Sequence, residues 1–417
     1  MIFWGYVQLL FVNGSCVSLG SKETTQDFCC ERHTAEALIS VKDGDTYMQT
    51  LLGNVLNLTP GHVIMWAVGG LLIWLAVKKD MEPALLLPMG FGAILVNLPL
   101  SGVVTHGDEV GVIDILFNAG IANELFPLLL FIGIGAMIDF GPLLSNPKLF
   151  LFGAAAQFGI FFTLSLAAFL GFDLKDAASI AIIGAADGPT SIFVANWFGT
   201  KYIGAIIVAA YSYMALVPII QPPVIRAITT REERLIRMPY TQGSVSQTVK
   251  ILFPIVVTII AGLVAPLSIG LVGFLMFGNL IRECGVLESL SQTAQKELAN
   301  LITIFLGLTV STKMQAHLFL TKETLMILLL GLVAFVFDTV GGVMLGKLFN
   351  LFSKNKINPM IGAAGISAFP MSARVIHKMG LKEDPQNFLL MHAAGANVSG
   401  QIASVIAGGL ILNLIAR

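Results

Sequence analysis

The sequence predicts an all-α polytopic membrane protein built from two inverted repeats, with interrupted, re-entrant helices at its core. Three observations support this fold class. Of the 417 residues, 56% are hydrophobic and only 12% are charged, whereas a soluble domain has roughly 25% charged residues. Apolar runs near the ~20 residues needed to cross a bilayer follow one another from His62 onward. The two halves of the chain also resemble each other.

The first 47 residues differ from the rest of the chain. "MIFWGYVQLLFVNGSCVSLG" has a short apolar core without a basic flank, and "SKETTQDFCCERHTAEALISVKDGD" is polar and lacks apolar periodicity. A signal peptide, an uncertain start codon and a peripheral arm all fit these features. We expect residues 1–47 to be a variable N-terminal extension without chemistry.

Twelve apolar segments follow this extension, with approximate boundaries. The connections between them are short except for 99–123 and the charged stretch 229–247. We therefore divide the membrane part into a first repeat (48–228), a charged cytoplasmic linker (229–248) and a second repeat (249–417). The apolar segments are 62–77, 81–98, 124–138, 148–171, 177–197, 202–228, 249–266, 264–282, 297–312, 324–346, 357–376 and 386–414.

Three blocks of sequence recur in the same order in both repeats. "EPALLLPMGF" matches "APLSIGLVGF", "LFIGIGAMIDFGPLLSNPK" matches "IFLGLTVSTKMQAHLFLTK", and "IIGAADGPTSIF" matches "MIGAAGISAFPM". The basic segments "VKKD" (77–80) and "RAITTREERLIR" (226–237) place the equivalent spans in opposite orientations if both are cytoplasmic. These matches predict the inverted duplication found in many transporters. The orientation requires one segment to re-enter without crossing, and we assign this to 177–197, with 357–376 as its counterpart.

Several classes of function are excluded by composition and motifs. The net charge of -1 and the absence of a basic cluster with interleaved aromatics argue against nucleic acid. The four cysteines form no CxxC pair, so neither a zinc site nor a disulfide framework is indicated. No nucleophile elbow, P-loop or HExxH occurs. Any pumping must therefore draw on an energy source other than ATP.

Asp187 is the strongest candidate site residue. It lies in "SIAIIGAADGPTSIFVANW", an otherwise apolar run, where an ionisable group is costly unless it faces protein, water or an ion. Gly188 and Pro189 disrupt the helix, so the preceding carbonyls lose their helical partners. Together with the hydroxyls of Thr190 and Ser191, these oxygens suit Na⁺ or a proton. A helix kink in which Asp187 pairs with a polar neighbour is the alternative.

The matching segment of the second repeat, "NPMIGAAGISAFPMSARVIHK", also gathers polar groups. Asn358, Ser367, Ser372 and Arg374 occur there among small residues and prolines. An intramembrane arginine needs an anion or a carboxylate partner. The alternative for Arg374 is that its side chain extends to the membrane interface.

Three further polar places fall within apolar segments. "HAAGANVSGQIAS" contains Asn397, and "AAYSYMALVPIIQPP" contains Tyr213. Close helix packing and a hydrogen-bonded packing tyrosine, respectively, are the alternatives to a site. Asp338 in "FVFDTVGG" is a second-rank candidate that could pair with a cation or with Arg374.

"GAADGPTSIF", "NPMIGAAGISAFPMSARV", "FDTVGG" and "FIGIGAMIDFGPLLSNPK" resemble the β subunit of the biotin-dependent sodium-pumping decarboxylases, the family of oxaloacetate, methylmalonyl-CoA and glutaconyl-CoA decarboxylases. The resemblance covers roughly 50–417. It implies that this subunit decarboxylates carboxybiotin, exports Na⁺ and consumes a proton. By motif, it also implies that Asp187 is the Na⁺-linked aspartate and that Tyr213 belongs to the coupled pathway. The family's second polar run falls on Asn358, Gly362, Ser367 and Arg374.

The implied cofactors are Na⁺ and a carboxybiotin carried on a partner subunit. The implied partners are a carboxyltransferase subunit, a biotin carrier subunit or domain, a small membrane γ/δ subunit and further copies of the β subunit, in a bacterial cytoplasmic membrane. Arg374 would hold the carboxylate or the ureido oxygen, and Asp187 would exchange Na⁺ for a proton. A Na⁺-coupled secondary transporter of an organic anion is the alternative, because it would share the inverted repeats and the arginine.

Overall fold

The computed structural model describes residues 55, 57–79, 81–239 and 245–415, and its helices lie in the compact unit Asn57–Arg417. The described residues form α-helices joined by short 3₁₀ and π turns, and they contain no strand. The predicted all-α class is therefore confirmed. The predicted extension, residues 1–47, lies outside the described residues.

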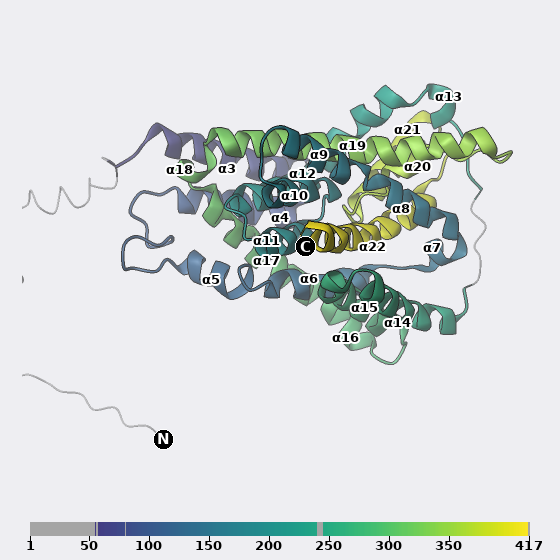
Figure 1. The fold of residues 1–417 in the computed structure, drawn as a ribbon, viewed down its shortest axis with the longest axis horizontal. Coiled ribbons are helices and arrows are strands. Elements are labelled where there is room, and N and C mark those ends of the chain that lie inside the picture. Colours follow the sequence, from purple (N-terminus) through teal and green to yellow (C-terminus); the bar gives the residue numbers. More distant parts are fainter. Residues whose placement is uncertain (1–54, 56, 80, 240–244, 416–417) are drawn as a thin grey trace, which may run out of the picture. The chain divides into compact units, whose positions relative to one another are not determined.

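The charged linker separates two series of helices (Figure 1). The first series comprises α3 (Pro60–Lys79), α4 (Pro83–Val96), α5 (Val112–Gly120), α6 (Leu125–Met137), α7 (Gly141–Ser145), α8 (Phe150–Ala156), α9 (Phe158–Phe169), α10 (Leu174–Ala181), α11 (Gly188–Phe198) and α12 (Ile203–Ile228). The linker contains α13 (Arg231–Arg234). The second series comprises α14 (Gln247–Val264), α15 (Ile269–Glu283), α16 (Glu288–Thr293), α17 (Ala299–Val310), α18 (Ala316–Phe319), α19 (Lys322–Phe352), α20 (Met360–Ala363), α21 (Met371–Glu383) and α22 (Leu390–Ile415).

Within the described residues, six helices are long and apolar enough to cross a membrane, namely α3, the run Pro147–Phe169, α12, α14, α19 and α22. A seventh is present if α5 and α6 form one span bent by 63°. The protein is thus a multi-pass membrane protein. The twelve apolar segments outnumber these helices because several of them, including 177–197 and 357–376, fold as short or broken helices.

Both segments that we predicted to be interrupted are broken in the structure. The first break divides 177–197 into α10, a 3₁₀ turn (Ile182–Ala185) and α11, and Ala186 adopts the left-handed conformation with φ 52°. The second break separates α20 from α21, with residues 364–370 between them. A further bend lies at Glu124 (φ 64°), between α5 and α6, in a region that apolar periodicity did not identify as broken.

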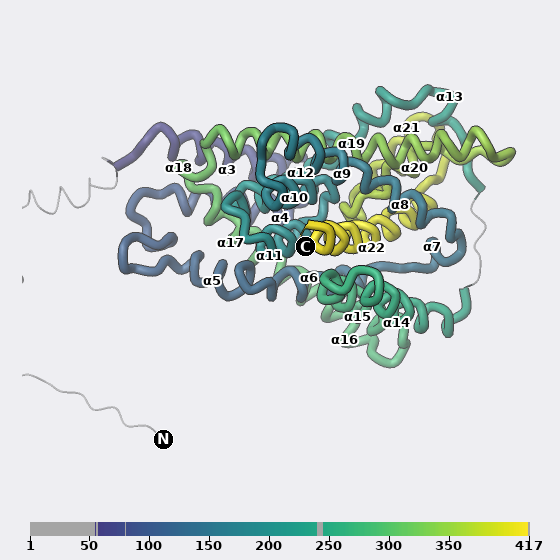
Figure 2. Tube along the Cα trace, viewed as in Figure 1, coloured from purple at the N-terminus to yellow at the C-terminus, as the bar shows by residue number. Residues whose placement is uncertain are grey.

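Helix α19 packs against both breaks. Gly184 of the first break lies against Ala334 and Asp338 of α19. Gly362 of the second break lies against Gly342, and a Cβ on either glycine would overlap the backbone of the other. Small residues permit such close approach between helices in a membrane. Helix α19 also runs alongside α9 and α12 (Figure 2), so it holds the two breaks within one bundle.

The first helices of the two repeats begin at opposite ends of the bundle. His62, near the start of α3, lines a cavity with Gln315 and His317. In contrast, α14 begins directly after the linker, at the other end of the bundle (Figure 1). Its Lys250 lies 3.8 Å from Asp139. An inverted repeat requires this arrangement, and the duplication itself stays a prediction.

We expect Gly342→Ala to lower the thermal midpoint of the purified protein, because the added Cβ would overlap the Gly362 backbone and overpacking costs about 1–3 kcal/mol. Gly70→Ala is the matched control, since nothing lies within 4 Å of a Cβ at that position. The measurement is the fraction of monodisperse protein that remains after heating in detergent. Equal midpoints for the two variants would contradict the close packing.

Candidate functional site

The first break places Asp187 at the amino terminus of α11. Its backbone is extended (φ -127°, ψ 98°), and its Oδ1 accepts a hydrogen bond from the Thr190 backbone N–H at 3.5 Å. Aspartate is a preferred residue at this capping position, and proline is favoured in the first turn that follows. The sequence Asp-Gly-Pro-Thr therefore ends one helix and starts the next with the carboxylate at the junction.

Asp187 is buried among hydroxyl groups. Its side chain is 3% exposed, and its Oδ2 accepts from Thr190 Oγ1 at 2.6 Å and from Ser404 Oγ of α22 at 3.2 Å. The hydroxyl of Ser191 donates to the Asp187 backbone carbonyl at 2.8 Å. No lysine, arginine or histidine among the described residues forms an ion pair with Asp187. A buried carboxylate without a cation is costly, so this arrangement favours a small bound cation or a proton.

Tyr211 of α12 covers the same turn. A Cβ added to Gly188 would overlap the Tyr211 ring, so the aromatic ring packs directly on the backbone beside Asp187. Tyr211 is 1% exposed, and its hydroxyl has no hydrogen-bond partner among the described residues. The structure thus brings Tyr211 to Asp187, whereas sequence reasoning favoured Tyr213.

The two breaks meet through one backbone hydrogen bond. The Ser367 N–H of the second break donates to the Ala185 carbonyl of the first break at 3.1 Å. Ala185 was expected to lose its helical partner, and its carbonyl is indeed bonded outside its own helix. The two polar segments, which lie about half the chain apart, therefore form a single buried unit.

Helix α22 carries three polar side chains that reach this unit. The Asn397 amide donates to Ala364 O at 3.2 Å and to Ile366 O at 2.7 Å. The Gln401 amide donates to Ser367 O, and Ser404 bonds to Asp187. The amide oxygens of Asn397 and Gln401 are buried and have no partner among the described residues. These spacings of four and three residues place all three side chains on one face of the helix.

Gln221 of α12 and Ser372 of α21 are hydrogen-bonded to each other and to the residue that precedes the second break. Gln221 Nε2 donates to Ala363 O at 2.6 Å and to Ser372 Oγ at 2.9 Å. Both residues are fully buried. Because Ser372 precedes Arg374 by two residues on α21, the helix that carries the arginine is bonded directly to the second break.

Arg374 is exposed and lines a cavity of about 270 Å³. The charged residues that share this cavity are Glu82, Arg226, Lys378 and Lys382. Four basic groups against one acidic group make the cavity suited to an anion. Asp338 lies elsewhere, fully buried in α19, and the described residues contain no ion pair between it and Arg374. The suggested pairing of these two residues is therefore wrong.

Three other residues that we predicted from the sequence lie outside the Asp187 group. The Tyr213 hydroxyl donates to Leu328 O of α19 at 2.5 Å. Gly362 packs against Gly342, as described above. The Asn358 amide donates to the carbonyls of Arg234 and Ile236 in the linker, at 2.9 Å each. Asn358 thus ties the second break to the linker rather than to Asp187.

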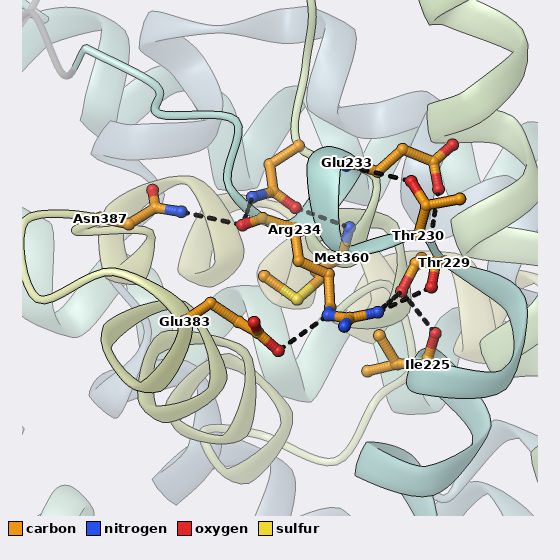
Figure 3. Close-up of polar contacts among 9 residues, drawn as sticks. Ile225, Thr229, Thr230, Glu233, Arg234, Met360, Glu383 and Asn387 are labelled. Atoms are coloured by element: carbon orange, nitrogen blue, oxygen red, sulfur yellow. Dashed lines mark hydrogen bonds and ion pairs between the residues drawn. The ribbon is translucent and has the colours of Figure 1, made fainter.

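The linker is itself bonded to the ends of several helices (Figure 3). Arg234 Nε lies 2.8 Å from Glu383 of α21, and its NH1 group donates to Thr229 O at 2.7 Å. The Asn387 amide donates to Arg234 O at 3.1 Å. The described linker residues 229–239 are therefore part of the packed structure, and Arg234 is bonded both to Glu383 of α21 and, through its carbonyl, to Asn358.

Sequence reasoning missed Ser404, and it noted Gln221 and Tyr211 only as polar residues of the stretch 209–223, without the contacts that they make. A signal for Ser404 was present, because Asn397, Gln401 and Ser404 follow helical spacing within one polar island. No comparable signal identifies Gln221 or Tyr211, whose partners lie on other helices.

Known proteins are similar to this chain over most of its length. Residues 61–415 match the family described as the Na⁺-transporting oxaloacetate decarboxylase β subunit. The chain is 50% identical to the methylmalonyl-CoA decarboxylase subunit β of Veillonella parvula, over 87% of this chain and 95% of that one. It is 49% identical to the glutaconyl-CoA decarboxylase subunit β of Acidaminococcus fermentans, over 86% and 94%. It is 45% identical to the oxaloacetate decarboxylase β chain 2 of Salmonella typhi, over 87% and 96%. The resemblance seen in the sequence is confirmed.

We expect Ser404→Ala to weaken Na⁺ binding to the purified protein by about fivefold, since a hydrogen bond contributes about 1 kcal/mol. Ser399→Ala is the control, because Ser399 lies on the same helix but donates to Phe150 O. Radioactive Na⁺ binding at equilibrium measures both. Unchanged affinity in Ser404→Ala, or an equal loss in Ser399→Ala, would argue against a cation at Asp187.

Proposed function

This chain belongs to the family of Na⁺-transporting oxaloacetate decarboxylase β subunits, whose activity couples decarboxylation to Na⁺ transport, and we propose that its own role is to decarboxylate carboxybiotin. Loss of CO₂ from the N-carboxyl group leaves an electron pair on the ureido nitrogen, and one proton restores its N–H bond. The proposed cycle exports Na⁺ from the bacterial cytoplasm while that proton is consumed. The carboxybiotin arrives on a partner subunit.

The observation that carries this proposal is a continuous path of contacts from the basic cavity to Asp187. Arg374 shares α21 with Ser372, which donates to Ala363 O at 3.2 Å. The second break, which follows Ala363 directly, then bonds through Ser367 to Ala185 of the first break. Asp187 follows two residues later. Such a path supports energetic coupling between two sites, because a shift of either break changes both.

Arg374 is proposed to hold the carboxylate or the ureido oxygen of carboxybiotin. A guanidinium binds a planar carboxylate through two parallel hydrogen bonds. Arg374 is exposed to the cavity, and Arg226, Lys378 and Lys382 strengthen its positive field. As CO₂ departs, negative charge develops on the ureido group, and a cation at the ureido oxygen would stabilise that charge.

Asp187 is proposed to bind Na⁺ and to exchange it for a proton. Thr190, Ser191 and Ser404 place hydroxyl oxygens beside it, of the hard type that Na⁺ prefers. Ser367 and Asn397, which belong to the same buried unit, are proposed to complete the set of ion ligands. Decarboxylation would move the two breaks from an inward-open to an outward-open arrangement and so release the ion outside.

Tyr213, Asn358 and Gly362 support this movement in the proposal. Tyr213 ties α12 to Leu328 of α19, Asn358 ties the second break to the linker, and Gly362 seats that break on α19. Each contact joins a break, or the helix beside it, to α19 or to the linker. Their substitution is expected to affect turnover without direct contact with Na⁺.

The proposed assembly is the one that the family resemblance implies. A carboxyltransferase subunit chooses the acyl substrate, and a biotin carrier subunit or domain delivers the carboxyl group to the cavity. A small membrane γ/δ subunit and further β copies complete the complex in the bacterial inner membrane.

Avidin, which sequesters biotin, should abolish Na⁺ transport by this complex. A secondary transporter of organic anions would be indifferent to avidin, and that result would overturn the proposal.

We expect Asp187→Asn to abolish both Na⁺ transport and coupled decarboxylation in the reconstituted complex, with a loss of at least about 100-fold because the only carboxylate of the ion site is removed. Asp139→Asn is the control, since Asp139 is 45% exposed beside Lys250. The assay follows radioactive Na⁺ uptake into vesicles together with CO₂ release. Normal pumping by Asp187→Asn would rule out the assigned ion site.

Arg374→Gln is expected to lower kcat/KM for carboxylated carrier by about 100-fold, the range for loss of a charge-stabilising donor, while Na⁺ binding to the isolated β subunit stays within about twofold. Arg237→Gln is the control, because Arg237 is exposed and pairs with Asp384 outside the cavity. Single-turnover decarboxylation gives kcat/KM. If Arg374→Gln decarboxylates normally, the cavity does not receive the carboxyl group.

A further inference from the structure

A second carboxyl group is buried in the core and has no part in the mechanism above. Asp338 lies in the middle of α19 and is 0% exposed. Its Oδ1 accepts a hydrogen bond from the Ile160 backbone N–H at 3.2 Å, at the amino terminus of α9. Its Oδ2 has no hydrogen-bond partner among the described residues. One oxygen is therefore anchored, and the other is left available.

Two glycines bring backbone directly against this carboxyl group. A Cβ added to Gly159 would lie 2.6 Å from Oδ1, and a Cβ added to Gly184 would lie 2.6 Å from Oδ2. Gly184 belongs to the first break and precedes Asp187 by three residues. The unpartnered oxygen thus faces the segment that carries the ion-binding carboxylate.

No basic side chain among the described residues forms an ion pair with Asp338. The elements that pack against α19 are α8, α9, α10, the 3₁₀ turn Ile182–Ala185, α12 and α20. Of these, α8, α9, α20 and the turn contain no titratable side chain. The titratable residues of α10 and α12 are Lys175, Asp176, Tyr211, Tyr213 and Arg226, and those of α19 itself are Lys322, Glu323 and Lys347. None of them forms a hydrogen bond or an ion pair with Asp338.

We propose that Asp338 is a second ion-exchange site of the pump, specific for a proton. It binds one proton while the first break packs against α19, since an ionised carboxylate there has no cation and one unsatisfied oxygen. When the first break moves away from α19, the carboxyl group is solvated and releases the proton. This inference rests on the proposed function, in which one proton restores the N–H bond of the ureido nitrogen as CO₂ departs. The inference is that Asp338 carries this proton.

The competing interpretation is that Asp338 only caps α9. Asp338→Asn separates the two, because the amide oxygen still accepts from Ile160 N–H but the side chain no longer binds and releases a proton. Asp338→Glu retains a titratable carboxyl group. Thr339→Val is the matched control, since Thr339 is buried at the next position and donates only to Phe335 O of the same helix.

The experiment compares these variants in the reconstituted decarboxylase complex across pH. In the unmodified complex the decarboxylation rate should fall as rising pH removes the proton from Asp338. Asp338→Asn should lower the rate at least about tenfold, as expected for loss of a proton-transfer group, and should remove this dependence on pH. Asp338→Glu should restore it with a displaced midpoint, and Thr339→Val should match the unmodified complex. A normal rate and pH profile in Asp338→Asn would overturn the proposal.

Two readouts on the purified β subunit distinguish this inference from the proposed function. Na⁺ binding to Asp338→Asn should stay within about twofold of the unmodified protein, because Asp187 is intact. Infrared difference spectra should contain a protonated-carboxyl band that is lost in Asp338→Asn and shifted in Asp338→Glu. If the band is absent from the unmodified protein, the assignment of a proton site to Asp338 is wrong, whatever the pH profile of decarboxylation by the complex. If the band is present but transport is insensitive to avidin, the proposed function fails while the site stands.

Discussion

Non-helical backbone at membrane depth has to find its hydrogen-bond partners inside the protein, because lipid provides none. The two breaks meet this constraint mainly through each other and through amide side chains. Ser367 donates to Ala185 across the breaks, and Gln221 and Asn397 donate to the carbonyls of Ala363, Ala364 and Ile366. The polar core is therefore held together by the need to satisfy the backbone, and the proposed ion site lies where that network reaches a carboxylate.

This origin of the core explains the chemical character of the site. The side chains bonded to the Asp187 carboxylate are hydroxyls, and the amides of Asn397 and Gln401 on the same face of α22 satisfy backbone carbonyls, so neither set adds charge. A site with one carboxylate and several neutral oxygens is balanced by a single positive charge, either Na⁺ or a proton. The basic groups are gathered instead around Arg374, in a separate cavity. Segregating the two sets of charges prevents Arg374 from neutralising Asp187 and leaves the carboxylate available for the transported ion.

The sequence was sufficient for the helical class, for both breaks and for the junction at which Asp187 lies, because each depends on local chemistry: apolar runs, Gly-Pro interruptions and a lone carboxylate in an apolar segment. It could not identify the residues to which the polar side chains are hydrogen-bonded. Ser404 contacts Asp187 across more than 200 residues, and Asn358 bonds to the linker instead of the ion site. The twelve apolar segments outnumber the long helices for the same reason, since where a helix ends depends on tertiary packing as well as composition.

The contact between Gly342 and Gly362 has a mechanical consequence. Backbone meets backbone there with no side chain interposed, so the two surfaces lack the interlocking ridges that normally fix one helix against another. Displacement along such a smooth contact requires no rotamer to change. The second break is thus seated on α19 in a way that permits a small shear, the kind of motion by which packed helices slide past one another without unfolding.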